Sequence, residues 1–135
     1  MYTIQKAKTE FLQAIKQAAP AGFIPALEDL ETPPDQKMGD LAFPCFDLAK
    51  SLKRNPAEIA TELAAKIGPK GLIAEAKAVG PYVNVVLNLK AFGEAVYGEM
   101  KELAQEYGMS DVGKDKRLMV EFANLNSHKD VHIGH

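Results

Sequence analysis

The sequence predicts an α+β protein, with a two-layer domain whose elements follow the order α-β-β-α-α-β-β-α. Apolar residues recur at helical spacing near the start, in the middle and late in the chain, whereas shorter stretches between them alternate apolar and polar residues, as strands do. The chain has 135 residues, 47% of them hydrophobic, which is enough to bury one core. We therefore expect a complete domain over residues 1–109 and a separate segment over residues 110–135.

The first half of the domain is expected to contain a helix, two strands and a second helix. The first helix ends at Pro20. Residues 24–31 are short and mixed and are interpreted as a strand, which the loop 32–39 follows. Residues 41–45 alternate weakly and predict a second strand, after which Pro44 turns the chain into a helix. The residues expected to face the core from the two helices are Ile4, Phe11, Leu12, Ile15, Ala18, Leu48, Ala49 and Leu52.

The second half is expected to contain a helix, a pair of strands and a long final helix. Asn55 and Pro56 begin the first of these, because Asn caps free N–H groups and Pro suits the first helical turn. Residues 72–87 are interpreted as two strands joined near Gly80-Pro81. The long helix has an apolar stripe made of Leu89, Phe92, Val96, Met100, Leu103 and Tyr107, and an acidic outer face without assigned chemistry made of Glu94, Glu99, Glu102 and Glu106.

Composition narrows the class of protein. No apolar run is long enough to span a membrane, and the charged N-terminus lacks the apolar centre of a signal peptide. The single Cys45 cannot form an internal disulfide, so a cytoplasmic protein is expected. The net charge is −2 and the pI about 5.9, so any contact with nucleic acid would be local rather than a general neutralisation of phosphates. Lys50, Lys53 and Arg54, near a helix end, form either a solvated face or an auxiliary phosphate contact.

Beyond residue 109 the sequence pattern no longer fits the first domain. Residues 110–116 are polar and are interpreted as a linker, and the apolar residues of 118–122 predict a strand for which no partner remains. We therefore expect a domain that begins here and is not completed. Three histidines within the last eight residues leave a zinc site, a disordered tail and the start of a larger unit as possibilities. The imidazoles of His128, His132 and His135 offer three ligands, whereas structural zinc usually takes four.

Motifs in both segments resemble those of one family. Residues 121–129, EFANLNSHK, followed by His132-Ile133-Gly134-His135, resemble the entry to the catalytic domain of the arginyl-tRNA synthetases, which are class I aminoacyl-tRNA synthetases. Gly39-Asp40-Leu41-Ala42, Asn55-Pro56 and Gly80-Pro81-Tyr82-Val83-Asn84 resemble the N-terminal additional domain of that family, in order and spacing. The resemblance implies that residues 1–109 bind tRNA and that the strand at 118–122 is the first of an incomplete Rossmann-like catalytic domain.

The resemblance also implies substrates and site residues. The full-length enzyme would use ATP and magnesium to activate arginine and would then esterify arginine tRNA, as a monomer. The 135-residue chain alone is expected to be inactive, because such a site needs several parallel strands. Leu125 stands where the family usually has proline. Unlike proline, leucine does not fix φ and has a backbone N–H. The residues implied to contact arginine are Asn124, Asn126 and His132, and those implied to line the ATP site are Lys129, His132, Gly134 and His135.

Tyr82 and Asn84 are the candidate tRNA-binding residues. They lie two residues apart on a predicted strand and so project from one face, opposite Val83, Val85 and Leu87. An aromatic ring beside an amide can hold one unstacked base, because the ring stacks on the base while the amide pairs with its edge. The resemblance implies that these two positions bind a nucleotide of the D-loop, at the elbow of the tRNA. The alternative is a solvent-facing pair on a half-buried strand.

Two other functions stay open at this point. One is a stand-alone RNA-binding module without catalysis, and the other is a non-RNA interaction domain with a metal-binding tail. Several hundred further codons after His135 would favour the enzyme over the module. A zinc titration with a chelator control would test the metal-binding tail.

Overall fold

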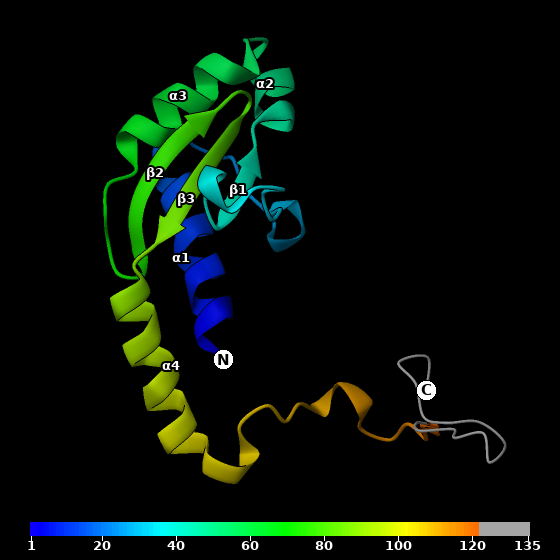
Figure 1. Ribbon diagram of the computed structural model, residues 1–135. Coiled ribbons are helices and arrows are strands. Elements are labelled where there is room, and N and C mark those ends of the chain that lie inside the picture. Colours follow the sequence, from blue (N-terminus) through cyan, green and yellow to red (C-terminus); the bar gives the residue numbers. More distant parts are fainter. Residues whose placement is uncertain (122–135) are drawn as a thin grey trace, which may run out of the picture. The chain divides into compact units, whose positions relative to one another are not determined.

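The computed structural model describes residues 1–121, and the chain divides into two compact units, Met1–Gln105 and Glu106–His135. The first unit contains four α-helices and one sheet of three strands among its described residues (Figure 1). The helices and strands are α1 (Thr3–Ala18), β1 (Leu41–Pro44), α2 (Phe46–Leu52), α3 (Pro56–Lys66), β2 (Ile73–Val79), β3 (Tyr82–Leu87) and α4 (Leu89–Leu103), with short 3₁₀ turns at Leu27–Asp29, Gln36–Met38, Ala104–Glu106 and Asp111–Gly113.

The sheet is antiparallel throughout, with the strand order β1-β3-β2. The hairpin expected over residues 72–87 is present, since Val79 pairs with Tyr82 across the two-residue turn Gly80-Pro81. Gly80 has a φ of +57°, which glycine adopts without strain at the first position of such a turn. Because β3 lies between the other two strands, its residues have neighbours on both sides.

The core lies between one face of the sheet and helices α1 and α3 (Figure 1). Helix α1 begins this layer with buried residues four apart, as its helical period requires. Asn55 accepts a hydrogen bond from Ala57 N at 2.9 Å and so caps α3, as predicted. The largest core side chains without exposed surface are Phe11, Ile15, Phe43, Val83 and Val85, and Cys45 is buried among them.

The strand predicted for residues 24–31 is wrong. That segment contains the 3₁₀ turn Leu27–Asp29, in which the Asp29 carboxylate accepts a hydrogen bond from Ala26 N at 2.9 Å. Pro25 has no N–H to donate to a ladder, and only Glu31 forms a bridge, with Ala42. The order of the described elements is therefore α-β-α-α-β-β-α, with one strand fewer than predicted.

The strand predicted for residues 118–122 is not found in its described part. Residues 118–121 have no strand partner there, and Leu118, Met119 and Val120 are 81%, 97% and 74% exposed. A strand requires a neighbour to accept and donate its backbone hydrogen bonds, and the described residues supply none to this segment. Phe122 and the residues after it lie outside the described part of the chain.

Helix α4 differs from its predicted faces. Leu89 and Met100 of the expected apolar stripe are 78% and 50% exposed, whereas Glu99, expected on the outer face, is buried. The Glu99 carboxylate lies 3.5 Å from the ammonium of Lys6 on α1. Phe92 of the predicted stripe does pack against the core. The charged contact of α4 with α1 was not predicted, because hydrophobic periodicity carries no information on ion pairs. Within residues 1–121, no helix is both long enough and apolar enough to cross a membrane.

Candidate nucleic-acid interface

The pairing of β3 decides where Tyr82 and Asn84 lie. Tyr82 pairs with Pro44 and Asn84 with Ala42 of β1, so these four residues share one face of the sheet. Val83 and Val85, which alternate with them, have no exposed surface and belong to the core. Tyr82 and Asn84 therefore lie on the sheet face that α1 and α3 do not cover, in the orientation that the alternation predicts.

Tyr82 forms an aromatic corner with Phe46. The ring centroids are 5.7 Å apart and the ring planes meet at 89°, which is an edge-to-face contact. Phe46 is the first residue of α2 and is 45% exposed, and Tyr82 is half-buried. Reasoning from the sequence missed Phe46, because its approach to Tyr82 depends on the pairing of Pro44 with Tyr82. Alternation within one strand does not specify that pairing.

Asn84 is buried, unlike Tyr82. Only 2% of it is exposed, so the two residues do not form a solvent-facing pair. Its Nδ2 donates a hydrogen bond to Met38 O at 3.0 Å, whereas Oδ1 is buried with no donor of the described residues in reach. The segment Gln36–Met38 covers this face and is also held by Lys77, whose Nζ donates to Lys37 O at 3.0 Å. A buried acceptor without a partner is uncommon in folded proteins and suggests a binding group.

Gly39 and Asp40 fix the covering segment to β3. Gly39 has a φ of +127°, and a Cβ atom there would lie 2.8 Å from Val85 O, so only glycine fits this approach. Asp40 N donates to the same Val85 O at 2.8 Å, and Asp40 Oδ2 accepts from Leu87 N at 2.8 Å. This is the physical role of the Gly39-Asp40 motif: it closes the sheet edge where β1 begins and holds the cover over Asn84.

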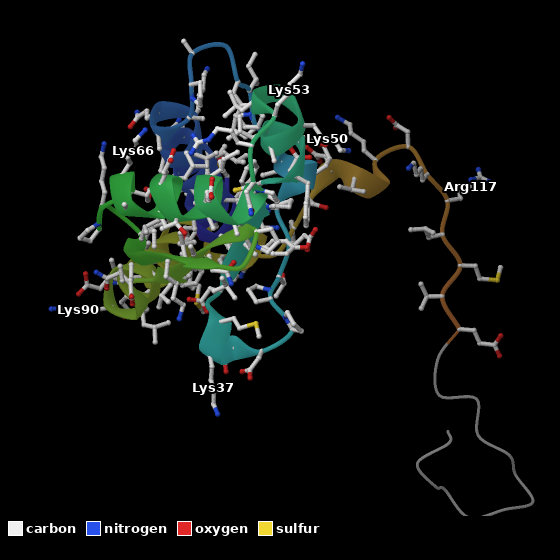
Figure 2. The ribbon with its side chains drawn as sticks, turned by 90° about the horizontal axis from the view of Figure 1, so that it is seen from above. Lys37, Lys50, Lys53, Lys66, Lys90 and Arg117 are labelled. Atoms are coloured by element: carbon white, nitrogen blue, oxygen red, sulfur yellow. The ribbon has the colours of Figure 1, made fainter. Side chains whose placement is uncertain are left out.

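A shallow hollow of about 390 Å³ runs along α2 from Phe46, a member of the aromatic corner, to the start of α3. Lys50 and Lys53 line it, and Figure 2 shows both at this helix, apart from the other labelled lysines. Arg54 also lines it, but its guanidinium binds the Glu62 carboxylate, and that hydrogen bond raises the pKa of Arg54 and lowers the pKa of Glu62. The complete lining is Phe46, Ala49, Lys50, Lys53, Arg54, Asn55 and Pro56.

Comparison with known proteins identifies the family. Residues 5–87, which contain β1, the hairpin and both candidate residues, match the family described as the arginyl tRNA synthetase N terminal domain. The chain belongs to the arginyl-tRNA synthetase N-terminal domain family. The predicted resemblance is confirmed over the part of the chain that forms the core.

Individual relatives agree with this family assignment. An arginine–tRNA ligase of Clostridioides difficile is 44% identical over 106 residues, which are 78% of this chain and 19% of that protein. An arginine–tRNA ligase of Treponema denticola is 35% identical over 136 residues, which cover 98% of this chain and 23% of that protein. A solved structure, Thermus thermophilus arginyl-tRNA synthetase, aligns with a TM-score of 0.50 and 30% identity over 62% of this chain and 14% of its own. The chain spans about a fifth of the length of the curated relatives it matches.

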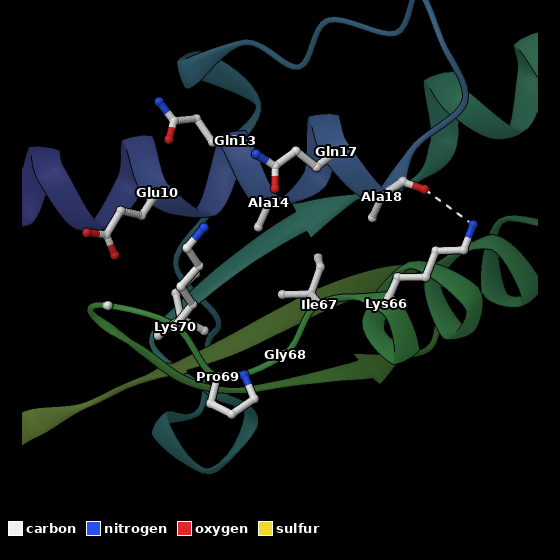
Figure 3. A pocket seen from close by; sticks show the side chains of 12 residues that line it. Glu10, Gln13, Ala14, Gln17, Ala18, Lys66, Ile67, Gly68, Pro69 and Lys70 are labelled. Atoms are coloured by element: carbon white, nitrogen blue, oxygen red, sulfur yellow. Dashed lines mark hydrogen bonds between the residues drawn. The ribbon is translucent and has the colours of Figure 1, made fainter.

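A larger hollow of this arginyl-tRNA synthetase N-terminal domain, about 610 Å³, lies between α1 and the loop before β2 (Figure 3). Its carboxylate and one of its ammonium groups are engaged in the fold, since Glu10 Oε2 accepts from Leu72 N at 2.8 Å and Lys66 Nζ donates to Ala18 O at 3.4 Å. No aromatic ring lines it. We therefore place the candidate interface at the aromatic corner. The hollow is lined by Glu10, Gln13, Ala14, Gln17, Ala18, Lys66, Ile67, Gly68, Pro69, Lys70, Gly71 and Ile73.

The residues that the sequence assigns to arginine and ATP all lie outside the described residues. The same holds for the three histidines considered as zinc ligands. Over residues 1–121, no group of three metal-ligating side chains comes together. The structure therefore brings Phe46 against Tyr82, and Phe46 also lines the hollow that Lys50 and Lys53 border. It does not describe the candidates for arginine and ATP binding, which are Asn124, Asn126, Lys129, His132, Gly134 and His135.

Proposed function

We propose that this chain is the tRNA-binding N-terminal part of an arginine–tRNA ligase, and that its open sheet face binds a D-loop nucleotide at the elbow of arginine tRNA. The family match and the ligases among the relatives support the choice of tRNA. The single observation that carries the location is the juxtaposition, on one sheet face, of the exposed aromatic corner and an amide whose oxygen is unpaired.

Tyr82 supplies the stacking surface of this proposed site. A half-buried ring that is fixed by a neighbouring ring loses little conformational freedom when a base stacks on it. Base–aromatic stacking contributes about 1–3 kcal/mol per base and tolerates every base. Tyr82 therefore supports affinity rather than discrimination among bases.

Asn84 supplies the discrimination. Its Oδ1 is a free acceptor two residues along the strand, and its Nδ2 is bound to Met38 O in the absence of RNA. A base can reach the amide when the segment Gln36–Met38 moves aside. The base edge then replaces the Met38 carbonyl and also pairs with the free oxygen. Because an amide presents a donor and an acceptor in fixed directions, it favours the base whose edge is complementary.

The longer enzyme would carry out the chemistry. We propose that it uses ATP and magnesium to activate arginine and then esterifies arginine tRNA. The relatives are named arginine–tRNA ligases, which supports the joining of arginine to tRNA. The Treponema match covers 98% of this chain and so extends past the described residues. It supports assigning Asn124, Asn126 and His132 to arginine and placing an ATP site in the same stretch. The ATP-site residues would be Lys129, His132, Gly134 and His135.

Binding of arginine tRNA transcripts, with the D-loop base varied, tests the proposal. Tyr82→Ala is expected to weaken binding of every transcript by about 5- to 150-fold, the equivalent of about 1–3 kcal/mol. Tyr82→Phe keeps the ring and should bind as the wild type does. Asn84→Ala should reduce the differences among the four D-loop bases more than it reduces the average affinity.

Tyr97→Ala is the matched control, because Tyr97 is an exposed tyrosine of α4, away from the sheet. It should leave binding unchanged. If Tyr82→Ala binds like Tyr97→Ala while its fold is intact, the site assignment is wrong. If the wild type does not prefer arginine tRNA over an unrelated RNA hairpin of equal length, the proposed function itself is wrong.

A further inference from the structure

We infer that the hollow along α2 is a second part of the RNA site, which binds the sugar-phosphate backbone next to the base stacked on Tyr82. In this inference the ring of Phe46 is a second surface on which a base can stack, and Lys50 and Lys53 bind phosphate. The inference rests on the proposed function and extends it to residues outside the Tyr82–Asn84 pair. It follows from the continuity of the aromatic corner with the hollow, since Phe46 belongs to both.

The charges of the hollow favour an anion. Arg54 is neutralised by Glu62, but Lys53 has no carboxylate within ion-pair distance among the described side chains. Lys50 lies 3.6 Å from Asp47, with both side chains more than 80% exposed, and such surface pairs contribute little to stability. A phosphate oxygen can therefore replace Asp47 as the partner of Lys50 at small cost, and Lys53 is available without any exchange.

Lys50 and Lys53 both line the hollow from α2. Lys53 adopts the left-handed conformation, with φ 52°, at the C-terminal end of α2, and the chain then turns into Asn55 and Pro56 at the start of α3. Lys50 lies three residues before Lys53, and the side chains of both line the same hollow. Lys66, by contrast, uses its ammonium on Ala18 O. Lys50 and Lys53 are thus a cationic pair on the lining of one hollow, and Figure 2 shows both side chains projecting from α2.

The floor of the hollow suits a sugar and a base rather than water alone. Ala49, Pro56 and the exposed part of Phe46 give it apolar surface between the cations. Single-stranded nucleic acid is commonly bound by this combination of aromatic rings and a positively charged track. A chain with a net charge of −2 cannot attract RNA as a whole. A small positive site that continues from an aromatic corner is what a local contact requires.

The test is the salt dependence of arginine tRNA binding by the full chain. The double variant Lys50→Gln/Lys53→Gln should bind more weakly at low salt. It should also reduce the slope of log affinity against log salt by about 1.4, because each phosphate contact on a single strand contributes about 0.7. Lys16→Gln/Lys90→Gln makes the same change in net charge at exposed positions on α1 and α4 and should leave the slope unchanged.

Phe46 is tested separately because it bears no charge. Phe46→Leu keeps an apolar side chain in the partly exposed position but removes the ring, so it should retain the thermal unfolding midpoint. It should weaken binding by about 5- to 150-fold, with the same dependence on salt as the wild type. Phe46→Tyr should bind as the wild type does, since it keeps the ring.

The outcomes separate this inference from the proposed function. Suppose that Tyr82→Ala weakens binding, but the double lysine variant keeps the wild-type salt slope and Phe46→Leu keeps the wild-type affinity. The hollow is then not part of the site, and only this inference is wrong. If Tyr82→Ala has no effect, the proposed function and this inference fall together. A slope reduced equally by both lysine double variants would indicate a general charge effect and would also overturn the inference.

Discussion

At the scale of single residues, burial distinguishes positions that the sequence pattern treats alike. Alternation along β3 places Tyr82 and Asn84 on one face, and both do lie there, but only Asn84 is covered. The cover comes from residues 36–38, nearly fifty positions earlier in the chain, so no local pattern could predict it. Cys45 was predictable as a core residue, and burial raises the pKa of its thiol to about 11, which makes it a poor nucleophile.

Substitution of Asn84 is expected to affect stability as well as binding. Asn84→Ala loses the hydrogen bond to Met38 O but also removes an unpaired oxygen, so the free energy of unfolding should fall by about 1 kcal/mol. Asn84→Asp should cost more, because it buries a carboxylate with one oxygen facing the Met38 carbonyl and removes the donor. Urea unfolding of both variants measures this. Asn84→Asp as stable as Asn84→Ala at pH 7 would show that the site is open to water.

At the scale of elements, the sequence predicted those whose signals are local. The cap at Asn55, the turn at Gly80-Pro81 and the alternation of β3 each depend on a few neighbouring residues. The incorrect predictions concern features that depend on contacts which the apolar pattern does not show. Residues 24–31 were misassigned because one side-chain hydrogen bond and one proline outweigh weak strand propensity. On α4 the burial of Glu99 was missed because its contact with α1 is ionic.

The contact between α4 and α1 makes a prediction about acid stability. Burial alone would raise the pKa of Glu99, but hydrogen bonding from the Thr3 backbone at the start of α1, together with Lys6, lowers it overall. A carboxyl whose pKa is lowered by folding stabilises the folded state. This contribution is fully present when the pH is above the pKa of the unfolded chain, about 4.3, and it is lost as the pH falls through the pKa of the folded state. Glu99→Gln should therefore be less stable than the wild type at pH 7, and the difference should shrink below about pH 4.

Thermal unfolding of wild type and Glu99→Gln between pH 7 and pH 3 measures this difference. Glu102→Gln is the control, since Glu102 lies on the same helix but is exposed. It should follow the wild type at every pH. A difference between wild type and Glu99→Gln that stays constant across this range would show that the ionised carboxylate does not hold the two helices together.

At the scale of the whole molecule, core and candidate interface belong to the same part of the chain. The core residues run from Ala7 to Leu87, and the family match covers residues 5–87. The aromatic corner and the cationic pair lie within these limits. The sequence could predict this organisation because motifs of a known domain occur in order. It could not predict which residues of different elements meet, since Phe46 reaches Tyr82 only through the pairing of β1 with β3.

Removal of residues 110–135 tests whether residues 1–109 form an independent tRNA-binding domain. None of the core residues lies in the removed segment, and its described apolar side chains, Val112, Leu118, Met119 and Val120, are exposed. Loss of exposed residues usually changes stability by no more than about 0.5 kcal/mol, so the unfolding midpoint should shift by no more than about 2–4 °C. Binding of arginine tRNA, with its dependence on Tyr82, should also persist.

A control that removes residues 88–135, including α4 and its Glu99–Lys6 contact, should lose stability markedly. If the shorter deletion unfolds the protein as the longer one does, the boundary near residue 109 is wrong, and the second unit contributes to the stability of the first.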